Sequence, residues 1–328
     1  MTSPERPPLL EVKDLFVTYT GRGRRPVTAV AGVDLSVAAG ETLGVVGESG
    51  CGKSTLARAI VGLVRPSRGQ ILIDGHDPAS AGRSVARDIR RTVQMVFQDP
   101  LTSLNPVMTV RQLVTEPWRV HRDLVPRDRL DDKLATLLTQ VGLPPQLADR
   151  RPRQFSGGQR QRIGIARALA VRPRLLVCDE PVSALDVSVQ AQVLNLLDDL
   201  RHAFGVSYLF ISHDLGVVRH LADRVAVMFL GRVVETGSVE AVYGRPAHPY
   251  TRALLAAATG GATRLHGEMP SPADPPSGCR FRTRCPIAQA ICATREPDLV
   301  RQPTGQLTAC HFPTATPTET STEGPSPT

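Results

Sequence analysis

The pattern of hydrophobic and polar positions predicts strands and helices that alternate along most of the chain. Between residues 9 and 37 apolar residues recur at every second position, which is the period of a strand with two different faces. The continuous apolar run at 175–178 is typical of a strand buried on both faces. Further strands are expected at 42–46, 71–73, 92–97, 208–211 and 225–234, the last range as edge strands carrying Gly231.

Helical spacing of apolar residues separates these strands. It predicts helices at 54–64, within 109–142, after Ser156 and at 187–204. Because strands and helices alternate on both sides of a purely helical stretch, we expect an α/β core that holds an inserted helical lobe. The expected organisation is a flexible start at 1–8, a main domain at 9–244 with its lobe at about 99–168, a tail module at 245–312 and a disordered end at 313–328.

Composition is that of an ordinary water-soluble protein. The chain has 328 residues, of which 41% are hydrophobic and 21% charged. No stretch approaches the ~20 consecutive apolar residues that a membrane span requires. The net charge is +8, but the arginines are scattered and no aromatic residues alternate with them, so we expect no nucleic-acid partner.

A glycine-rich loop follows the strand expected at 42–46 and precedes a helix. Glycines let backbone N–H groups turn inward around a phosphate, and the helix directs its positive end at the same anion. Lys53 is expected to reach the β- and γ-phosphates, Ser54 to ligate Mg²⁺ and Thr55 to contact the α-phosphate. The loop consists of Gly47, Glu48, Ser49, Gly50, Cys51, Gly52, Lys53 and Ser54.

Two adjacent carboxylates end the buried run at 175–178. Successive side chains at the end of a strand diverge, so Asp179 and Glu180 can do different work. We expect Asp179 to hold Mg²⁺ through water. Glu180 is expected to orient and polarise the attacking water as a general base.

A second glycine motif begins the helix after Ser156. It consists of Ser156, Gly157, Gly158 and Gln159, with Ser156 placed as the helix cap. The helix dipole and the exposed backbone favour an anion here as well. Because the chain's own loop already surrounds one side of a γ-phosphate, this motif is expected to serve a nucleotide held by another subunit.

These motifs, in this order, resemble the ATP-binding subunits of ABC transporters from about residue 9 to residue 312. The fold that the resemblance implies is α/β: a P-loop, RecA-like core with an N-terminal antiparallel β subdomain, an inserted helical lobe and a small C-terminal module that contains cysteines. The matching segments are Gly47 to Thr55 (Walker A), Gln98 (Q-loop), Ser156 to Gln159 (signature), Leu175 to Glu180 (Walker B), Ser183 to Asp186 (D-loop) and His213 (switch).

The family's residue roles apply to matching positions. Gln98 would sense Mg²⁺, Asp186 would signal across an ATPase dimer, and His213 would contact the γ-phosphate. Tyr19 lies where the family stacks an aromatic ring on adenine. One departure is Phe155, where the family more often has leucine.

Within the family, three segments resemble oligopeptide and dipeptide importers: 98–106, 248–254 and 270–286. Residues 44–51 with Phe155 resemble the second, F-type ATPase of such importers. The resemblance implies ATP and Mg²⁺ as cofactors, a second ATPase subunit, two membrane permeases, a peptide-binding protein acting indirectly, and a peripheral place on the cytoplasmic face of the membrane.

Other functions stay open at this point. An importer ATPase for nickel, glutathione or another small solute would share the same motifs. A soluble ATPase for chromosome work would need a long coiled-coil insertion or a zinc hook. A soluble translation-type protein would carry two ATPase cassettes, and the sequence contains one.

Four of the six cysteines cluster in the tail, with the spacing Cys-x5-Cys-x6-Cys-x17-Cys. Cytosolic proteins rarely rely on disulfides, so clustered thiols suggest a metal. The spacing fits neither common zinc sites nor common ferredoxins, and unmetallated cysteines are about as compatible with it. The family resemblance favours a [4Fe–4S] cluster on Cys279, Cys285, Cys292 and Cys310.

Overall fold

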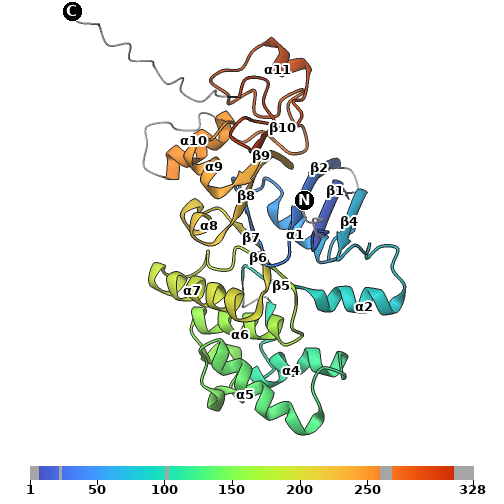
Figure 1. Ribbon diagram of the computed structural model, residues 1–328, viewed down its shortest axis with the longest axis vertical. Helices are drawn as coiled ribbons and strands as arrows, with labels where there is room; N and C mark the ends of the chain where they lie inside the picture. Colours follow the sequence, from blue (N-terminus) through green and yellow to red (C-terminus); the bar gives the residue numbers. More distant parts are fainter. Residues whose placement is uncertain (1–6, 22–23, 100–102, 259–267, 314–328) are drawn as a thin grey trace, which may run out of the picture.

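The computed structural model describes residues 7–21, 24–99, 103–258 and 268–313. The expected flexible start and disordered end lie almost entirely outside these residues. Two sheets form, with strand orders β2-β1-β4 and β10-β11-β9-β8-β3-β7-β6-β5 (Figure 1). The strands are β1 (Leu10–Gly21), β2 (Arg24–Val37), β3 (Thr42–Val46), β4 (Arg68–Ile73), β5 (Val93–Val96), β6 (Leu175–Asp179), β7 (Ser207–Ser212), β8 (Arg224–Phe229), β9 (Arg232–Ser238), β10 (Val300–Arg301) and β11 (Leu307–Thr308).

Helices lie between and around these strands. They are α1 (Lys53–Ile60), α2 (Arg83–Thr92), α4 (Val110–Val120), α5 (Leu130–Gln140), α6 (Gly157–Leu169), α7 (Val187–Phe204), α8 (Leu215–Leu221), α9 (Val239–Gly244), α10 (Pro249–Ala258) and α11 (Ala290–Thr294). The expected helix at 54–64 ends early, at Ile60, because the chain turns at Gly62 with φ +77°.

The larger sheet has a parallel centre. Strands β8, β3, β7, β6 and β5 run in the same direction, and β3, β6 and β7 are buried along their whole length. This confirms the α/β core. The expectation of edge strands at 225–234 is wrong for both strands, because β8 lies between β3 and β9, and β9 lies between β8 and β11. The reason is that β9 and the two tail strands continue the sheet beyond β8, and this extension protects its outer side.

The smaller sheet is antiparallel and packs on the other side of α1. Strand β1 pairs with β2 and with β4. Its inward residues, among them Leu15 and Val17, share one hydrophobic cluster with Leu56 and Ile60 of α1 and Val45 of β3. The expected N-terminal antiparallel subdomain is therefore present, and the helix that follows the glycine loop is held between the two sheets.

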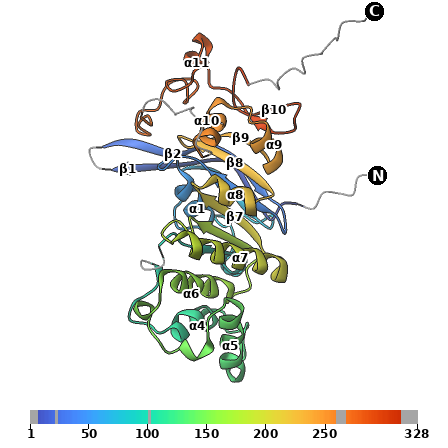
Figure 2. The same cartoon turned by 90° about the vertical axis from the view of Figure 1, so that its left-hand side faces the viewer.

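The inserted lobe consists of α4 and α5 with the start of α6, and it projects from the core (Figure 2). Thr109 caps α4 through a reciprocal pair of bonds with Gln112. The Trp118 indole N–H donates to the Ala170 carbonyl oxygen at 2.7 Å, which ties α4 to the end of α6. Helix α6 also packs on β5 and α7, so it connects the lobe mechanically to the core.

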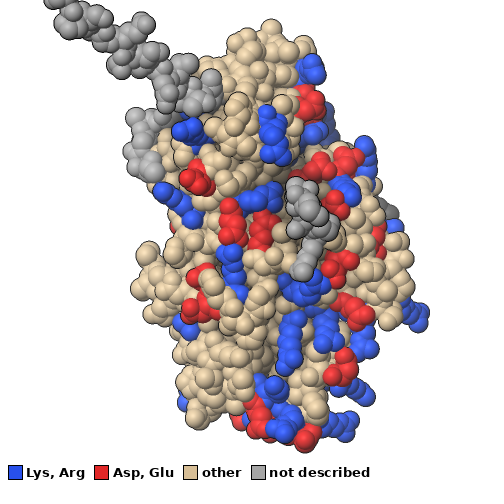
Figure 3. All heavy atoms as spheres, viewed as in Figure 1, with Lys and Arg blue, Asp and Glu red and all other residues tan. Residues whose placement is uncertain are grey.

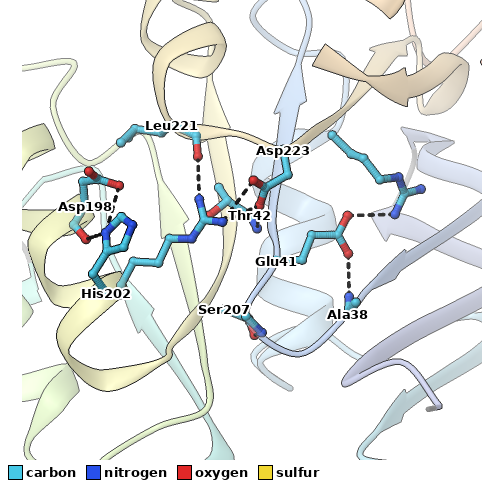
Figure 4. Close-up of polar contacts among 11 residues, drawn as sticks. Ala38, Glu41, Thr42, Asp198, His202, Ser207, Leu221 and Asp223 are labelled. Carbon is cyan, nitrogen blue, oxygen red and sulfur yellow. Dashed lines mark hydrogen bonds and ion pairs between the residues drawn. The ribbon is translucent and has the colours of Figure 1, made fainter. Parts of the chain in front are cut away.

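A polar cluster fastens the amino ends of the central strands (Figure 4). The Asp223 carboxylate accepts from the Thr42 backbone N–H at 2.8 Å and forms an ion pair with Arg201 of α7 at 2.8 Å. Glu41, which precedes β3, pairs with Arg224 of β8 at 2.9 Å. These contacts fix β3 and β8 at one end, while their opposite ends carry the candidate site.

The tail is built onto the free edge of the large sheet. Strand β11 pairs with β9, and β10 pairs with β11. Glu235 of β9 is fully buried and accepts from the backbone N–H groups of Ala247 at 2.8 Å and His248 at 2.9 Å. Burial raises the pKa of the Glu235 carboxyl, and these donors oppose that shift. The tail is therefore anchored both by strand pairing and by a buried polar contact.

Basic and acidic side chains are interspersed over α2 and the lobe on the face shown in Figure 3. Arg87 and Arg91 of α2 both pair with Asp123, and Arg111 pairs with Asp131 and Asp149. These arginines are therefore paired locally with acidic side chains. In the part of the chain that the structure describes, the helices are too short or too polar to cross a bilayer.

Candidate functional site

The glycine loop connects β3 to α1, and two of its glycines are required by sterics. Gly47 has φ +154°, and a Cβ there would lie 2.2 Å from the Met228 carbonyl oxygen. Gly52 has φ +109°, and a Cβ there would lie 2.1 Å from the Ala29 carbonyl oxygen. Any side chain at either position would force the backbone apart. The loop is therefore held in one curved shape by strands from both sheets.

Lys53 lies across this loop. Its side chain is only 4% exposed, and Nζ donates to the carbonyl oxygens of Gly47 at 2.7 Å and Glu48 at 3.0 Å. A lysine restrained in this way presents its charge to an anion cradled by the loop. Burial raises the pKa of the neighbouring Cys51 thiol, which suits a packed residue better than a nucleophile.

Ser54 and Asp179 meet at the base of the loop. The Ser54 hydroxyl donates to Asp179 Oδ1 at 2.8 Å, and the Asp179 carboxylate is buried at the end of β6. Burial raises the pKa of Asp179, while the bond from Ser54 lowers it. A hydroxyl and a carboxylate beside a phosphate loop are the oxygen ligands that Mg²⁺ takes in such sites. The residues present therefore fit this cation.

Three of the predicted residues converge on one carboxylate. Gln98 Nε2 donates to Glu180 Oε2 at 3.1 Å, and His213 Nδ1 lies 3.1 Å from the same oxygen. The three side chains follow β5, β6 and β7, whose carboxyl ends share one edge of the sheet. Glu180 has φ +46°, a strained value for a non-glycine residue that is found more often at functional sites.

Of two further predicted residues, Tyr19 lies beside the loop and Asp186 lies at the start of α7. The Tyr19 hydroxyl is 3.5 Å from Thr55 Oγ1, and the Tyr19 side chain is 44% exposed. An exposed aromatic ring at this position has a face available for stacking on a base. Asp186 begins α7 as its N-terminal cap residue, where the anion-favouring end of that helix lies.

The second glycine motif caps α6 as expected. Ser156 Oγ accepts from the Gln159 N–H at 3.3 Å, and Gln159 Oε1 accepts from the Ser156 N–H at 3.0 Å. A Cβ on Gly158 would lie 2.4 Å from Val189 Cγ1, which explains the glycine by the close packing of α6 on α7. Across the described segments, no hydrogen bond or ion pair joins this motif to the glycine loop. The chain thus presents two separate anion-favouring sites.

Sequence reasoning missed two residues at the loop. The Glu48 N–H donates to the Tyr250 hydroxyl oxygen at 2.9 Å, and Arg284 forms two bonds to the Glu48 carboxylate at 2.7 and 3.1 Å. Both residues belong to segments that the sequence marked only as tail motifs. Their separations from Glu48, 202 and 236 residues, leave no periodic pattern that could have revealed the contact.

The tail cysteines lie near one another but form no metal centre in this structure. The Cys279 N–H donates to the Cys292 carbonyl oxygen at 2.8 Å. The pKa values of Cys279, Cys285 and Cys310 are raised, mainly by burial and in smaller part by neighbouring thiols, that of Cys310 to about 11. Within the described ranges, no three His, Cys, Asp or Glu side chains are arranged to hold a metal ion. The geometry therefore gives the expected iron–sulfur ligation no support.

Two family models match the chain. One, described as "ABC transporter", matches residues 30–183, and the other, described as "Oligopeptide/dipeptide transporter, C-terminal region", matches residues 234–292. The oligopeptide transport ATP-binding protein AppF of Bacillus subtilis is 48% identical over 95% of this chain and 99% of its own length. The oligopeptide transport ATP-binding protein OppF of Salmonella typhimurium is 49% identical over 90% of this chain and 93% of its own.

Solved structures agree on the fold. The chain matches the dimeric, post-hydrolysis structure of the ATP-binding cassette MJ0796 bound to ADP and Pi with a TM-score of 0.64 and 29% identity, over 70% of this chain and 98% of that one. It matches cbiO1 of Clostridium perfringens, part of the ABC transporter complex cbiONQ, with a TM-score of 0.63 and 28% identity, over 72% of this chain and 91% of that one.

Burial of Asp179 gives a prediction that separates stability from ion binding. A carboxyl whose pKa is raised on folding stabilises the protein below its unfolded pKa, and that contribution is lost as pH rises through the folded pKa. Without Mg²⁺, Asp179→Asn should therefore raise the melting temperature at neutral pH, and this gain should shrink as the pH falls towards the ordinary carboxylate range.

The same variant should weaken Mg²⁺ binding in the presence of nucleotide by about tenfold or more, because a charged oxygen ligand is lost. Calorimetry and Mg²⁺ titration measure the two effects, with the exposed Asp274→Asn as the matched control. A variant that is less stable than the wild-type protein at neutral pH, with Mg²⁺ affinity unchanged, would contradict both assignments.

Proposed function

The chain belongs to the ABC transporter family of ATP-binding proteins, and from this premise we propose that it energises the import of oligopeptides or dipeptides. The observation that carries the proposal is the pairing of a complete nucleotide site with a tail that matches the C-terminal region of oligopeptide/dipeptide transporters. The relatives AppF and OppF, each about 48–49% identical, are oligopeptide transport ATP-binding proteins, which favours the F-type assignment. ATP hydrolysis is the family's activity.

The loop residues bind and position the nucleotide. Backbone N–H groups of residues 49–54 and the Lys53 ammonium surround the phosphates, and Tyr19 stacks on the base. Ser54 and Asp179 hold Mg²⁺, which when bound offsets phosphate charge. Their fixed geometry means that little reorganisation is needed when charge develops in the transition state.

Glu180 acts as the general base of this site. Its carboxylate is held by Gln98 from the edge of the lobe and by His213 from the end of β7. This arrangement orients Oε2 through two partners, one that follows β5 and one that follows β7. Its main task is to orient the water and to accept its proton late in the reaction.

Glu180→Gln should lower the hydrolysis rate about a hundredfold or more while ATP affinity stays near that of the wild-type protein, because the amide orients water but accepts no proton. Single-turnover hydrolysis and equilibrium nucleotide binding measure the two quantities. Glu240→Gln, at an exposed position on α9, is the control. Full turnover by the Glu180 variant would remove Glu180 from the role of base.

The Ser156–Gln159 motif completes the site of a second ATPase subunit. The anion-favouring start of α6, capped by Ser156, supports this proposal, and the matched cassette MJ0796 was solved as a dimer. In a head-to-tail dimer, each ATP lies between the loop of one subunit and the capped α6 of the other. The partner is a paired ATPase, the same chain or a related one. Two permeases and, indirectly, a peptide-binding protein complete the assembly at the cytoplasmic face of the membrane.

Mixing two inactive variants tests the shared site. Lys53→Ala removes the loop cation, and Ser156→Arg blocks the α6 cap, so each protein alone should hydrolyse almost no ATP. A mixed dimer contains one site with an intact loop and an intact cap, and it should recover part of the wild-type rate. Recovery is measured by phosphate release, with dimer formation monitored by light scattering. Mixed dimers that stay inactive would contradict the shared site.

Cargo can be decided with the assembled transporter in lipid vesicles. If the importer carries peptides, its ATP hydrolysis should rise several-fold when a peptide-loaded binding protein is present, because substrate delivery favours closure of the ATPase pair. Ni²⁺ and glutathione, the rival cargoes, serve as the comparison additions. A rise with either of these, and none with oligopeptides or dipeptides, would overturn the peptide assignment.

A [4Fe–4S] cluster on the four tail cysteines stands as a separate proposal. The sequence resemblance supports it. A four-iron cluster is larger than a single ion, so its thiolates stand further apart than the ligands of one metal. The iron content and visible spectrum of anaerobically purified protein decide the matter, and a folded, active, iron-free protein would count against the cluster.

A further inference from the structure

The C-terminal tail grips the phosphate loop at Glu48. The Tyr250 hydroxyl oxygen accepts from the Glu48 backbone N–H at 2.9 Å. The Arg284 guanidinium meets the Glu48 carboxylate with two parallel bonds, from one nitrogen to Oε2 at 2.7 Å and from the other to Oε1 at 3.1 Å. One loop residue is thus held through both its backbone and its side chain.

These contacts are shielded from water. Tyr250 is fully buried, the Arg284 side chain is 5% exposed, and that of Glu48 is 23% exposed. The Tyr250 ring packs on Phe229 and Phe281, with centroids 4.8 and 5.4 Å away. Two bonds between a guanidinium and a carboxylate fix both the distance and the relative orientation of the two groups. Low solvent access strengthens this ion pair.

The tail also supports the loop from behind. Arg280 donates to the Leu230 carbonyl oxygen, and the next residue, Gly231, donates its N–H to the Cys51 carbonyl oxygen at 2.8 Å. Arg280 and Arg284 belong to one short segment that lies between Cys279 and Cys285. A single stretch of the tail therefore contacts the loop directly at Glu48 and indirectly at Cys51.

Arg284 compensates the negative charge that Glu48 places in the loop. A carboxylate within a phosphate-binding loop repels the anion that the loop must hold. Arg284 neutralises this charge and draws the carboxylate towards the tail. The Tyr250 hydroxyl oxygen accepts a hydrogen bond from the Glu48 N–H, and this bond fixes the peptide plane at the start of the loop.

We propose that Arg284 and Tyr250 are positioning residues of the nucleotide site, which act through Glu48 to keep the loop in its anion-binding shape. The inference rests on the proposed function of the loop as an ATP site. It assigns to the C-terminal module a direct part in ATP binding. The module would then do more than extend the sheet, since ATP affinity would depend on its being docked.

A double-mutant cycle of Arg284 and Glu48 in the full-length protein tests this positioning role. Arg284→Gln leaves the Glu48 charge uncompensated and should weaken Mg·ATP binding about tenfold, with KM rising more than kcat falls. Glu48→Gln removes the repelling charge, so Arg284→Gln in that background should cost at most about twofold. A purely structural role for Arg284 would give no such rescue.

Tyr250→Phe provides a second, milder variant with no change of charge. It leaves the Glu48 N–H without its acceptor and should weaken Mg·ATP binding about threefold to tenfold. Two controls are matched to these changes. Arg282→Gln removes a tail arginine whose side chain bonds to Ser277, and Tyr243→Phe removes a hydroxyl that donates to the Leu215 carbonyl oxygen.

These measurements distinguish failure of the proposed ATP site from failure of the positioning role of Arg284 and Tyr250. If the wild-type protein binds no Mg·ATP, the proposed function fails. If it binds, and Arg284→Gln and Tyr250→Phe bind equally well, the positioning role is overturned. If the Arg284→Gln defect persists unchanged in the Glu48→Gln background, or if the controls lose as much affinity, the positioning role is also overturned. Should Arg284→Gln fold poorly, Tyr250→Phe alone decides it.

Discussion

The structure depends on the close approach of three backbone segments at the phosphate loop. Gly47 lies against the Met228 carbonyl of β8, and Gly52 lies against the Ala29 carbonyl of β2. One contact comes from the large sheet and the other from the antiparallel sheet, so the loop is where the two sheets meet. The Gly231 N–H donates to the loop at Cys51, and its carbonyl accepts from Ala31 of β2. A side chain at either loop glycine would separate the sheets as well as spoil the anion site.

Each charged group at the site has a polar partner within the chain. Lys53 is satisfied by loop carbonyls, Asp179 by Ser54, and Glu180 by Gln98. Each of these partners is one that a phosphate, a metal ion or a water molecule can replace. Burial opposes the charged form of Asp179, so the protein bears a cost that a cation would relieve. Binding of a ligand can therefore exchange these internal contacts of Lys53, Asp179 and Glu180 for contacts with the ligand.

The sequence was informative where a single local pattern determines structure. The apolar runs at 175–178 and 208–211, the glycine loop and the capped α6 follow from short segments, and the structure places them as expected. Parallel strands order their carboxyl ends along one edge, which explains why Gln98, Glu180 and His213 meet. Prediction from the sequence failed for features that depend on residues far apart along the chain. The amphipathic α2, which carries mainly arginines, was not predicted, and the interior place of β8 depends on strands that lie in the tail.

The chain itself supports the nucleotide loop at Glu48. Tyr250 and Arg284 bind this residue, and the tail strands extend the same sheet that supplies Asp179. The other glycine motif, capped by Ser156, begins α6, and no hydrogen bond or ion pair among the described residues joins it to the loop. In the proposed head-to-tail dimer, the chain would stabilise its own loop and a partner subunit would close it. The loop would then stay rigid while the subunits separate, so that opening and closing need not reshape the phosphate site.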